Sequence, residues 1–386
     1  MPTLRRIFKW LLWTAAGLLA VVLAAAAYLA WPRSYARNYL QDGSTAATAR
    51  GLARVANEKR TQPFHVGTIG DPARLQELDE FLPGDFNSVT AENAMKWEPL
   101  LDHHRLGPGG PLCYDFAAAD RFVDHCLQRG VRVRGHNLVW GRFLSDAFVA
   151  DVEARLKASP DPKAAMRQLL REHLTAVMGH FRGRVREWDV LNEPLAIFKP
   201  ELDNTIWHRT LGDGYIAEIF QMAREADPEA KLFLNEQLES YGDARAEKLL
   251  ALLAELVRNK VPLDGLGIES HVTVKAPDLK ELQRFLERVT QLGLKFELTE
   301  IDVRLRIFSS APDPYAAQAE YMGELVRTAA AFKECRGVTF WGLSDKHSWM
   351  DGFPPFKFMK PNEPLLLDEN YRRKPAYWAV ERALAR

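Results

Sequence analysis

Eight short β-rich runs alternate with helical patterns along this 386-residue chain, and no other feature restricts its fold as much. Amphipathic stretches such as 246–253 and 278–292 separate the runs. Such alternation predicts an α/β fold with parallel strands, because each parallel crossover needs a helix. Eight such units predict a (β/α)8 TIM barrel. The candidate strands are residues 64–70, 86–90, 131–136, 186–192, 231–235, 265–271, 295–300 and 337–342.

A doubly wound open sheet is the alternative architecture. That fold carries a glycine-rich turn after its first strand, and no G-x-G-x-x-G motif follows residues 64–70. The barrel is therefore preferred, as one domain over residues 46–386.

An uncharged segment occupies residues 10–31, directly after the basic residues Arg5, Arg6 and Lys9. Its apolar part, residues 11–30, has the length of about 20 residues that crosses a bilayer as a helix. The basic cluster predicts that the amino end lies in the cytoplasm. The segment is therefore predicted to be a single N-terminal transmembrane helix, with the membrane as a partner.

These features divide the chain into a membrane anchor or signal segment at 1–33, a linker at 34–45 and a barrel at 46–386. The barrel would lie on the non-cytoplasmic side, in the periplasm or outside the cell. Signal cleavage and secretion are the alternative, since Ala25–Ala27 resembles a cleavage site. The apolar run is longer than the usual signal core of roughly 7–15 residues, which favours the anchor.

Charge and cysteine content narrow the range of partners. Lys and Arg (51) balance Asp and Glu (51), so we expect no nucleic-acid partner.

The three cysteines form no C-x-x-C motif and are predicted to be structural thiols, with a Cys113–Cys126 disulfide as the alternative. Glu172, His173 and His180 lack metalloprotease spacing and are assigned to a solvated helix face. No metal or organic cofactor is predicted.

Two apolar runs end in glutamates, Glu193 and Glu300, that are far apart in the sequence. The carboxyl ends of barrel strands share one face, so the fold can bring these two side chains together. Paired carboxylates that flank one bond are what glycoside hydrolysis requires. The sequence therefore points to an enzyme that cleaves carbohydrates.

Other strand ends carry polar and aromatic residues together. Sugar rings have apolar faces and hydroxylated edges, so a sugar site needs flat aromatic rings and convergent polar groups. A polysaccharide or oligosaccharide is therefore the expected partner. Taken singly, His136 and His271 could be core histidines, and Trp341 and Trp349 could be core aromatics.

These motifs resemble glycoside hydrolase family 10, the endo-1,4-β-xylanase family. The resemblance implies a retaining hydrolase that cleaves β-1,4-xylosidic bonds in xylan or xylo-oligosaccharides through a covalent intermediate. The matching blocks follow one another in the expected order at residues 90–97, 134–140, 188–193, 270–271, 298–302 and 339–349.

The resemblance assigns a role to each matching residue. Glu193 corresponds to the general acid/base and Glu300 to the nucleophile. Asn192 would hold the 2-hydroxyl of the reacting sugar, and His271 would orient Glu300. Apart from the resemblance, Asp302 is expected to support the site rather than to act in it. The implied substrate-binding residues are Glu92, Asn93, Lys96, His136, Trp140, Asn192, His271, Trp341 and Trp349.

The chain departs from the family pattern at several positions near these motifs, among them Ser145 and Ala147 in place of a proline and a tryptophan. Gly141 and Phe143 replace a histidine and a glutamine, Gln237 replaces an aromatic residue, and Glu269 replaces a glutamine. These changes affect the surroundings of the glutamate pair and leave the pair itself in place. Two alternatives therefore stand beside xylan hydrolysis: hydrolysis of a different β-linked glycan such as an exopolysaccharide, and a catalytically silent carbohydrate-binding barrel.

Overall fold

A computed structural model describes residues 35–40, 48–102, 110 and 112–385 of the chain. The predicted transmembrane segment 1–33 lies outside these residues. Within the part that the structure describes, no helix has the length and apolar character needed to cross a bilayer.

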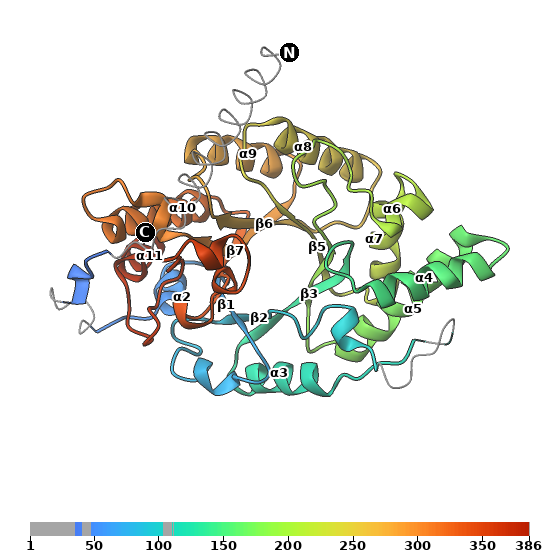
Figure 1. Cartoon of the computed structure of the whole chain (residues 1–386), viewed down its shortest axis with the longest axis horizontal. Coiled ribbons are helices and arrows are strands. Elements are labelled where there is room, and N and C mark those ends of the chain that lie inside the picture. The colour runs from blue at the N-terminus through green and yellow to red at the C-terminus, as the bar shows by residue number, and fades with distance from the viewer. Residues whose placement is uncertain (1–34, 41–47, 103–109, 111, 386) are drawn as a thin grey trace, which may run out of the picture.

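The strands form one closed parallel barrel, in which each strand pairs with the next and β8 pairs with β1. Figure 1 shows the strands as an inner ring with the helices outside it. This confirms the predicted (β/α)8 barrel. The strands are β1 (His65–Gly70), β2 (Ser88–Ala91), β3 (Arg132–Trp140), β4 (Glu187–Asn192), β5 (Lys231–Gln237), β6 (Gly265–Val272), β7 (Lys295–Val303) and β8 (Cys335–Phe340).

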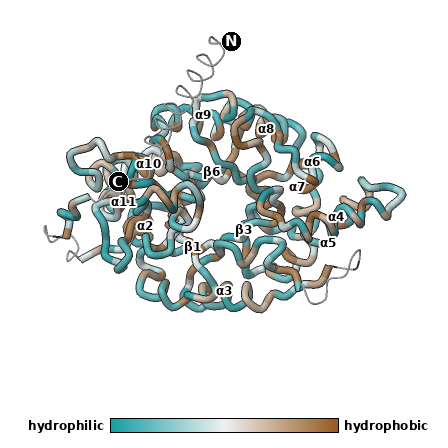
Figure 2. Tube along the Cα trace, in the orientation of Figure 1, coloured by the Kyte–Doolittle hydropathy of each residue, from teal (hydrophilic) through white to brown (hydrophobic). Residues whose placement is uncertain are grey.

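The outer helices begin at polar caps and bury one apolar side. The Asp161 and Asp313 side chains accept hydrogen bonds from the first turns of α5 and α10, and a proline occupies the first helical position of both. Figure 2 shows the resulting alternation of hydrophobic and hydrophilic positions along the outer helices. The helices are α2 (Leu52–Asn57), α3 (Ala117–Gln128), α4 (Asp146–Ala158), α5 (Pro162–Phe181), α6 (Ile206–Leu211), α7 (Tyr215–Ala226), α8 (Ala244–Arg258), α9 (Leu279–Gln291), α10 (Pro314–Ala330) and α11 (Pro375–Leu384).

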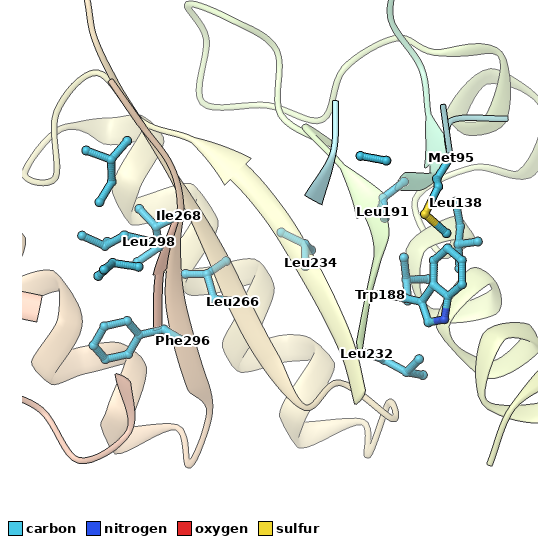
Figure 3. Close-up of a cluster of buried hydrophobic side chains, with 14 of the residues drawn as sticks. Met95, Leu138, Trp188, Leu191, Leu232, Leu234, Leu266, Ile268, Phe296 and Leu298 are labelled. Carbon is cyan, nitrogen blue, oxygen red and sulfur yellow. The ribbon is translucent and has the colours of Figure 1, made fainter. Parts of the chain in front are cut away.

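The apolar core lies between the outer face of the barrel and the helices. Figure 3 shows Trp188, Leu138 and Met95 in one part of this layer and Phe296, Leu298 and Leu266 in another. Trp188 is completely buried, and any Cβ at Gly135 would lie 2.1 Å from its ring. The glycine therefore allows β3 to run directly against the indole of β4.

Charged side chains fill part of the barrel interior. Arg134 is 1% exposed and forms two hydrogen bonds to Asp189, at 2.6 and 3.1 Å, and a third to Glu297 at 3.0 Å. Asp189 also contacts His136, with Oδ2 3.0 Å from Nδ1. Buried charges need such partners to avoid a large desolvation cost. The network fixes β3, β4 and β7 relative to one another below the carboxyl-terminal face.

Part of the predicted linker packs on the barrel. Arg37 pairs with Glu363 and Glu369, and the buried ring of Tyr39 meets Tyr315 of α10 edge-on, with centroids 5.0 Å apart. Residues 35–40 are thus attached to the last third of the fold.

One sequence prediction about α5 is wrong. His173 does not lie on a solvated face: it is completely buried, stacks on Trp97 with ring centroids 3.7 Å apart, and contacts the Leu138 carbonyl oxygen at 2.9 Å. The position on α5 that carries it faces β3, so packing determines its environment. The cysteines are unpaired thiols, and the alternative Cys113–Cys126 disulfide is absent.

Candidate active site

Four consecutive strands contribute polar side chains to the centre of the carboxyl-terminal face. Nδ2 of Asn235 in β5 shares its two hydrogens among three acceptors: Asn192 of β4 at 2.8 Å, and Glu269 of β6 and Glu300 of β7 at 2.9 Å each. Thr299 Oγ1 donates to Asn235 Oδ1 at 2.7 Å, which fixes the orientation of the amide. All five side chains are buried. The barrel therefore joins residues from β4 and β7 that the sequence separates widely.

A second hydrogen-bonded series holds Glu300 from the other side. His271 Nε2 lies 3.1 Å from Glu300 Oε2, and His271 Nδ1 lies 2.9 Å from Asp302 Oδ1. The latter contact is an ion pair whose angles fall outside hydrogen-bond geometry. Trp349 Nε1 donates to Asp302 Oδ2 at 2.7 Å. The structure thus brings Glu300, His271 and Trp349 together, with Asp302 in the supporting position that the sequence predicted.

Glu193 lies just beyond β4 and is held by two donors. Trp140 Nε1 is 2.8 Å and Arg142 Nη1 is 2.9 Å from the same atom, Oε2. Arg142 is itself held by Asp203, at 2.9 Å, and by the Leu195 carbonyl oxygen. Both donors therefore hold Glu193 through Oε2. The Glu193 backbone has φ of 48°, a conformation uncommon outside glycine that often marks functional positions.

The remaining predicted residues line the space beside this centre. Lys96 Nζ lies 4.9 Å from the centroid of the Trp140 ring and donates to Asn93 Oδ1 at 2.9 Å. A cavity of about 690 Å³ is lined by these three residues together with Arg142 and Phe143. It combines an aromatic wall with cations and amides, as the sugar-site prediction requires.

Trp341 and Glu92 are the last two of the predicted substrate-binding residues, and their surroundings differ. The Trp341 indole is 7% exposed and meets His136 and His271 edge-on, with centroids 5.2 and 6.1 Å apart, so it lies between two predicted site residues. Glu92 lines a separate small cavity of about 40 Å³ with Arg74 and His347. Glu92 is thus at the margin of the site.

Burial and neighbouring charges set different protonation states for the two buried carboxyl groups around Asn235. Burial acts to raise the pKa of Glu300, but the hydrogen bond from His271 and the charge of His136 outweigh it and hold that pKa below its usual range. Burial raises the pKa of Glu269 well above its usual range, and the charges of Glu300 and Glu193 and a hydrogen bond with Glu193 raise it further. Glu300 therefore ionises at lower pH than Glu269, which holds its proton to higher pH than an ordinary glutamate.

Only one group of side chains in the described ranges has the composition and spacing to hold a metal ion. The ligand atoms of Glu269, His271 and Glu300 lie within 4.8 Å of one another. Burial would lower the pKa of His271, but Asp302 and Glu300 raise it to about 10. A metal-binding histidine must be neutral, so an ion at this group would have to displace a proton from His271.

Four of the departures from the family pattern differ in their surroundings. A Cβ at Gly141 would lie 2.1 Å from Thr205 Cγ2, so the close approach of Thr205 requires glycine there. Phe143 is 73% exposed with φ of 55°, whereas Glu269 is buried in the Asn235 network. Gln237 ends β5, and its carbonyl oxygen accepts from Arg245.

Asn235 and Arg142 belong to the site although the sequence analysis assigned them no role. The sequence could have indicated Asn235, because it lies at the end of a predicted strand and precedes a glutamate, as Asn192 precedes Glu193. Arg142 gave no comparable signal, because a cation in a loop is usually solvated. Its role depends on the folded position of Asp203, which belongs to the next loop.

A closed parallel barrel with two buried, differently supported glutamates beside aromatic and amide side chains defines a glycoside hydrolase. The chain matches the model of glycosyl hydrolase family 10 over residues 55–383, and it belongs to that family. It is 32% identical over 330 residues to a β-1,4-xylanase of Dictyoglomus thermophilum, covering 82% of this chain and 87% of that one. An endo-1,4-β-xylanase of Geobacillus stearothermophilus is also 32% identical, with 82% and 94% covered.

Solved structures show the same similarity in three dimensions. Native xylanase 10B of Thermotoga maritima superposes with a TM-score of 0.74 at 29% identity, covering 88% of this chain and 98% of that one. Xylanase 10B of Thermotoga petrophila, solved in complex with xylobiose, gives 0.74 at 28% identity, with the same coverage.

Proposed function

We propose that the protein is a retaining endo-1,4-β-xylanase that hydrolyses xylan or xylo-oligosaccharides, with Glu300 as nucleophile and Glu193 as general acid/base. The observation that carries the proposal is the different support of the two carboxyl groups. Glu300 is kept ionised by His271, whereas Glu193 is held through Oε2 by Trp140 and Arg142. The family relatives named above, which are xylanases, support xylan as the substrate.

In the first step, a Glu300 oxygen would bond to the anomeric carbon while the bond from that carbon to the leaving oxygen breaks. Glu193 would give its proton to that oxygen, and Arg142 and Trp140 would stabilise the carboxylate that remains. Water then replaces Glu300 at the same carbon and passes a proton to Glu193. This double displacement requires the two carboxyl groups to be about 5–5.5 Å apart.

The other residues would bind the sugars and orient the reacting one. Asn192 accepts from Asn235 through Oδ1, so its Nδ2 is left to donate to the 2-hydroxyl. Lys96, Asn93 and His136 would contact sugar hydroxyls, with Glu92 at the margin. Trp140, Trp341 and Trp349 would pack against the ring faces.

The test uses the full chain purified in mild detergent, with β-1,4-xylan, xylopentaose and a panel of other β-glycans. Release of reducing ends from xylan that is lost in Glu193→Ala and Glu300→Ala supports the proposal. Glu201→Ala is the matched control, because that carboxylate is 61% exposed and pairs only with a neighbouring lysine in the described structure. NMR detection of the first-formed anomer tests retention.

A different β-glycan is the second candidate, favoured by the Arg142–Glu193 pair and the exposed Phe143 beside Trp140. Turnover confined to another glycan of the panel would select it. Binding without turnover of any glycan would instead indicate a silent carbohydrate-binding barrel.

We also propose that residues 1–33 anchor the protein in a membrane and leave the barrel on the non-cytoplasmic side. The basic cluster followed by a long apolar run supports this arrangement. A carboxyl-terminally tagged chain should sediment with membranes at full length and be degraded by protease added to spheroplasts. A shorter, soluble product would indicate signal cleavage and secretion.

A further inference from the structure

Two aromatic side chains meet between loops that leave non-adjacent strands. Phe143 follows β3 and Phe353 follows β8, and their ring centroids are 6.4 Å apart at an interplanar angle of 72°. This is an edge-to-face contact within the normal range for aromatic pairs. Because β1 and β2 lie between β3 and β8 in the barrel, the contact connects loops across the mouth of the barrel.

The pair continues into a longer row of rings. Trp140 lies 5.1 Å from Phe143, Trp349 lies 5.7 Å from Phe353, and His271 lies 5.3 Å from Trp349, all between centroids. The row begins at Trp140, which donates to Glu193, and ends at His271, which contacts Glu300. One continuous aromatic series therefore connects the partners of both glutamates.

Core packing does not account for the two central rings. Phe143 is 73% exposed and Phe353 is 43% exposed, so both keep much of their apolar surface in water. Phe143 also has φ of 55°, which is unfavourable for an aromatic residue. An exposed ring in a costly backbone conformation at the edge of a site points to a binding function.

Cavities lie at both ends of the row. Trp140 and Phe143 line the cavity of about 690 Å³, while His271 lines another of about 550 Å³ together with Phe198 and Val274. Phe198 and Val274 are 87% and 80% exposed and offer an apolar surface for sugar faces. A sugar chain that occupies both cavities therefore extends from one end of the aromatic row to the other.

We propose that Phe143 and Phe353 form an arch over the cleft, and that this arch makes the enzyme select short oligosaccharides over long polymers. The inference rests on the proposed hydrolysis and specifies its substrate class. An open cleft accepts an internal segment of a polymer from the side. A cleft closed above by the Phe143–Phe353 contact must be entered by a chain end, so the enzyme would cut internal bonds that lie near an end. A short chain presents ends at a much higher concentration per sugar.

The experiment compares the full wild-type chain with Phe143→Ser, Phe353→Ser and the double variant. Phe358→Ser is the matched control, since Phe358 is also 61% exposed and follows β8, but its ring contact in the described structure is with Lys357 alone. Each protein is assayed for kcat/KM on xylopentaose and for initial rate on soluble xylan. Product lengths are measured during the first few per cent of reaction.

Opening the arch should raise the ratio of xylan to xylopentaose activity by about tenfold in the double variant, a typical size for a change in pocket shape. Early products from xylan should change from short oligosaccharides to fragments of mixed length. An unchanged ratio in the double variant, equal to that of wild type and Phe358→Ser, would overturn the arch.

A binding measurement tests the arch independently of the proposed hydrolysis. In a Glu300→Ala background, affinity electrophoresis through soluble xylan measures access without turnover. The arch predicts stronger retardation when both phenylalanines are replaced, whether or not the wild-type chain hydrolyses xylan. Equal retardation would count against the arch, whereas lack of turnover by the wild type would count against the hydrolase alone.

Discussion

Asn235 donates a hydrogen bond to Glu300, with Nδ2 2.9 Å from Oε1, although β6 lies between their strands. The same amide nitrogen reaches Asn192 and Glu269, so one side chain contacts residues of three other strands. Its position makes Asn235 the main connection between the strand that leads to Glu193 and the strand that carries Glu300.

Replacing Asn235 by alanine should therefore lower kcat more than it changes KM. Loss of one preorganised donor to a reacting group typically costs about 10²–10³ in rate. Asn235→Asp should be at least as damaging, because it places another carboxyl beside Glu269 and Glu300. Steady-state kinetics on xylopentaose checks both variants. Activity near wild type in Asn235→Ala would show that the network does not hold Glu300.

Arg142→Met removes a cation that joins Glu193 to Asp203. We expect about 1–3 kcal/mol lower stability to urea, because the part-buried carboxylates lose their donors. A lower kcat should accompany it, since the carboxylate formed when Glu193 gives up its proton is then less stabilised. Arg209→Met is the control, because its pair with Glu153 is 3.9 Å long and half exposed. Equal effects in both variants would contradict the role given to Arg142.

Glu269→Gln tests the protonated state of Glu269. Its raised pKa means that the wild-type side chain holds its proton to higher pH than an ordinary glutamate and then gains a negative charge beside Glu300. The glutamine variant cannot gain that charge. We therefore expect similar activity at the pH values where Glu269 is still protonated, and a high-pH limb of the kcat/KM profile that is displaced to higher pH in the variant. An unchanged high-pH limb would disprove this assignment.

The same substitution should also alter stability. An unfolded glutamate ionises near pH 4.3, whereas folded Glu269 keeps its proton to higher pH. The folded chain therefore binds one more proton in this interval, and stability due to Glu269 falls as pH rises. Urea unfolding at pH 4, 5.5 and 7 should show the wild type losing stability relative to Glu269→Gln across this series. A constant difference would mean that folded Glu269 titrates normally.

The sequence predicted the barrel because its information is local and repeated. Strand runs, helix caps and amphipathic spacing each arise within a few residues, and the geometry of a parallel barrel places every strand end on one face. The boundaries were less accurate at the site: β3 continues past His136 to Trp140, and β7 continues past Glu300 to Val303. Register shifts with neighbouring strands occur in both, and these depend on pairing that a single segment does not reveal.

Site residues that act through distant partners were harder to predict. Glu193 and Glu300 stand directly after apolar runs, so local pattern was enough to select them. The local sequence pattern did not predict the surroundings of Arg142 and His173, because their hydrogen-bond partners come from other loops and strands. The roles of the selected residues in catalysis and binding remain predictions.

Gly267 of β6 illustrates how the strand packing fixes the site. A Cβ at this position would lie 2.1 Å from Asn235 Oδ1 and 3.0 Å from Thr299 Cγ2. Gly267→Ala must therefore displace the Asn235 amide, which in turn loosens its hydrogen bonds to Glu269 and Glu300. We expect a stability loss of about 1–3 kcal/mol from overpacking and a lower kcat on xylopentaose.

Gly179→Ala separates this effect from the general consequences of replacing glycine. Gly179 is an exposed residue of α5, and a Cβ there would meet no atom within 4 Å. Helix propensity predicts that this variant gains roughly 0.5–1 kcal/mol and keeps full activity. Urea unfolding and kcat on xylopentaose are measured for both variants to compare the two substitutions. If Gly267→Ala retained wild-type kcat, the Asn235 amide could shift without disturbing Glu300, and its orientation would not be needed for catalysis.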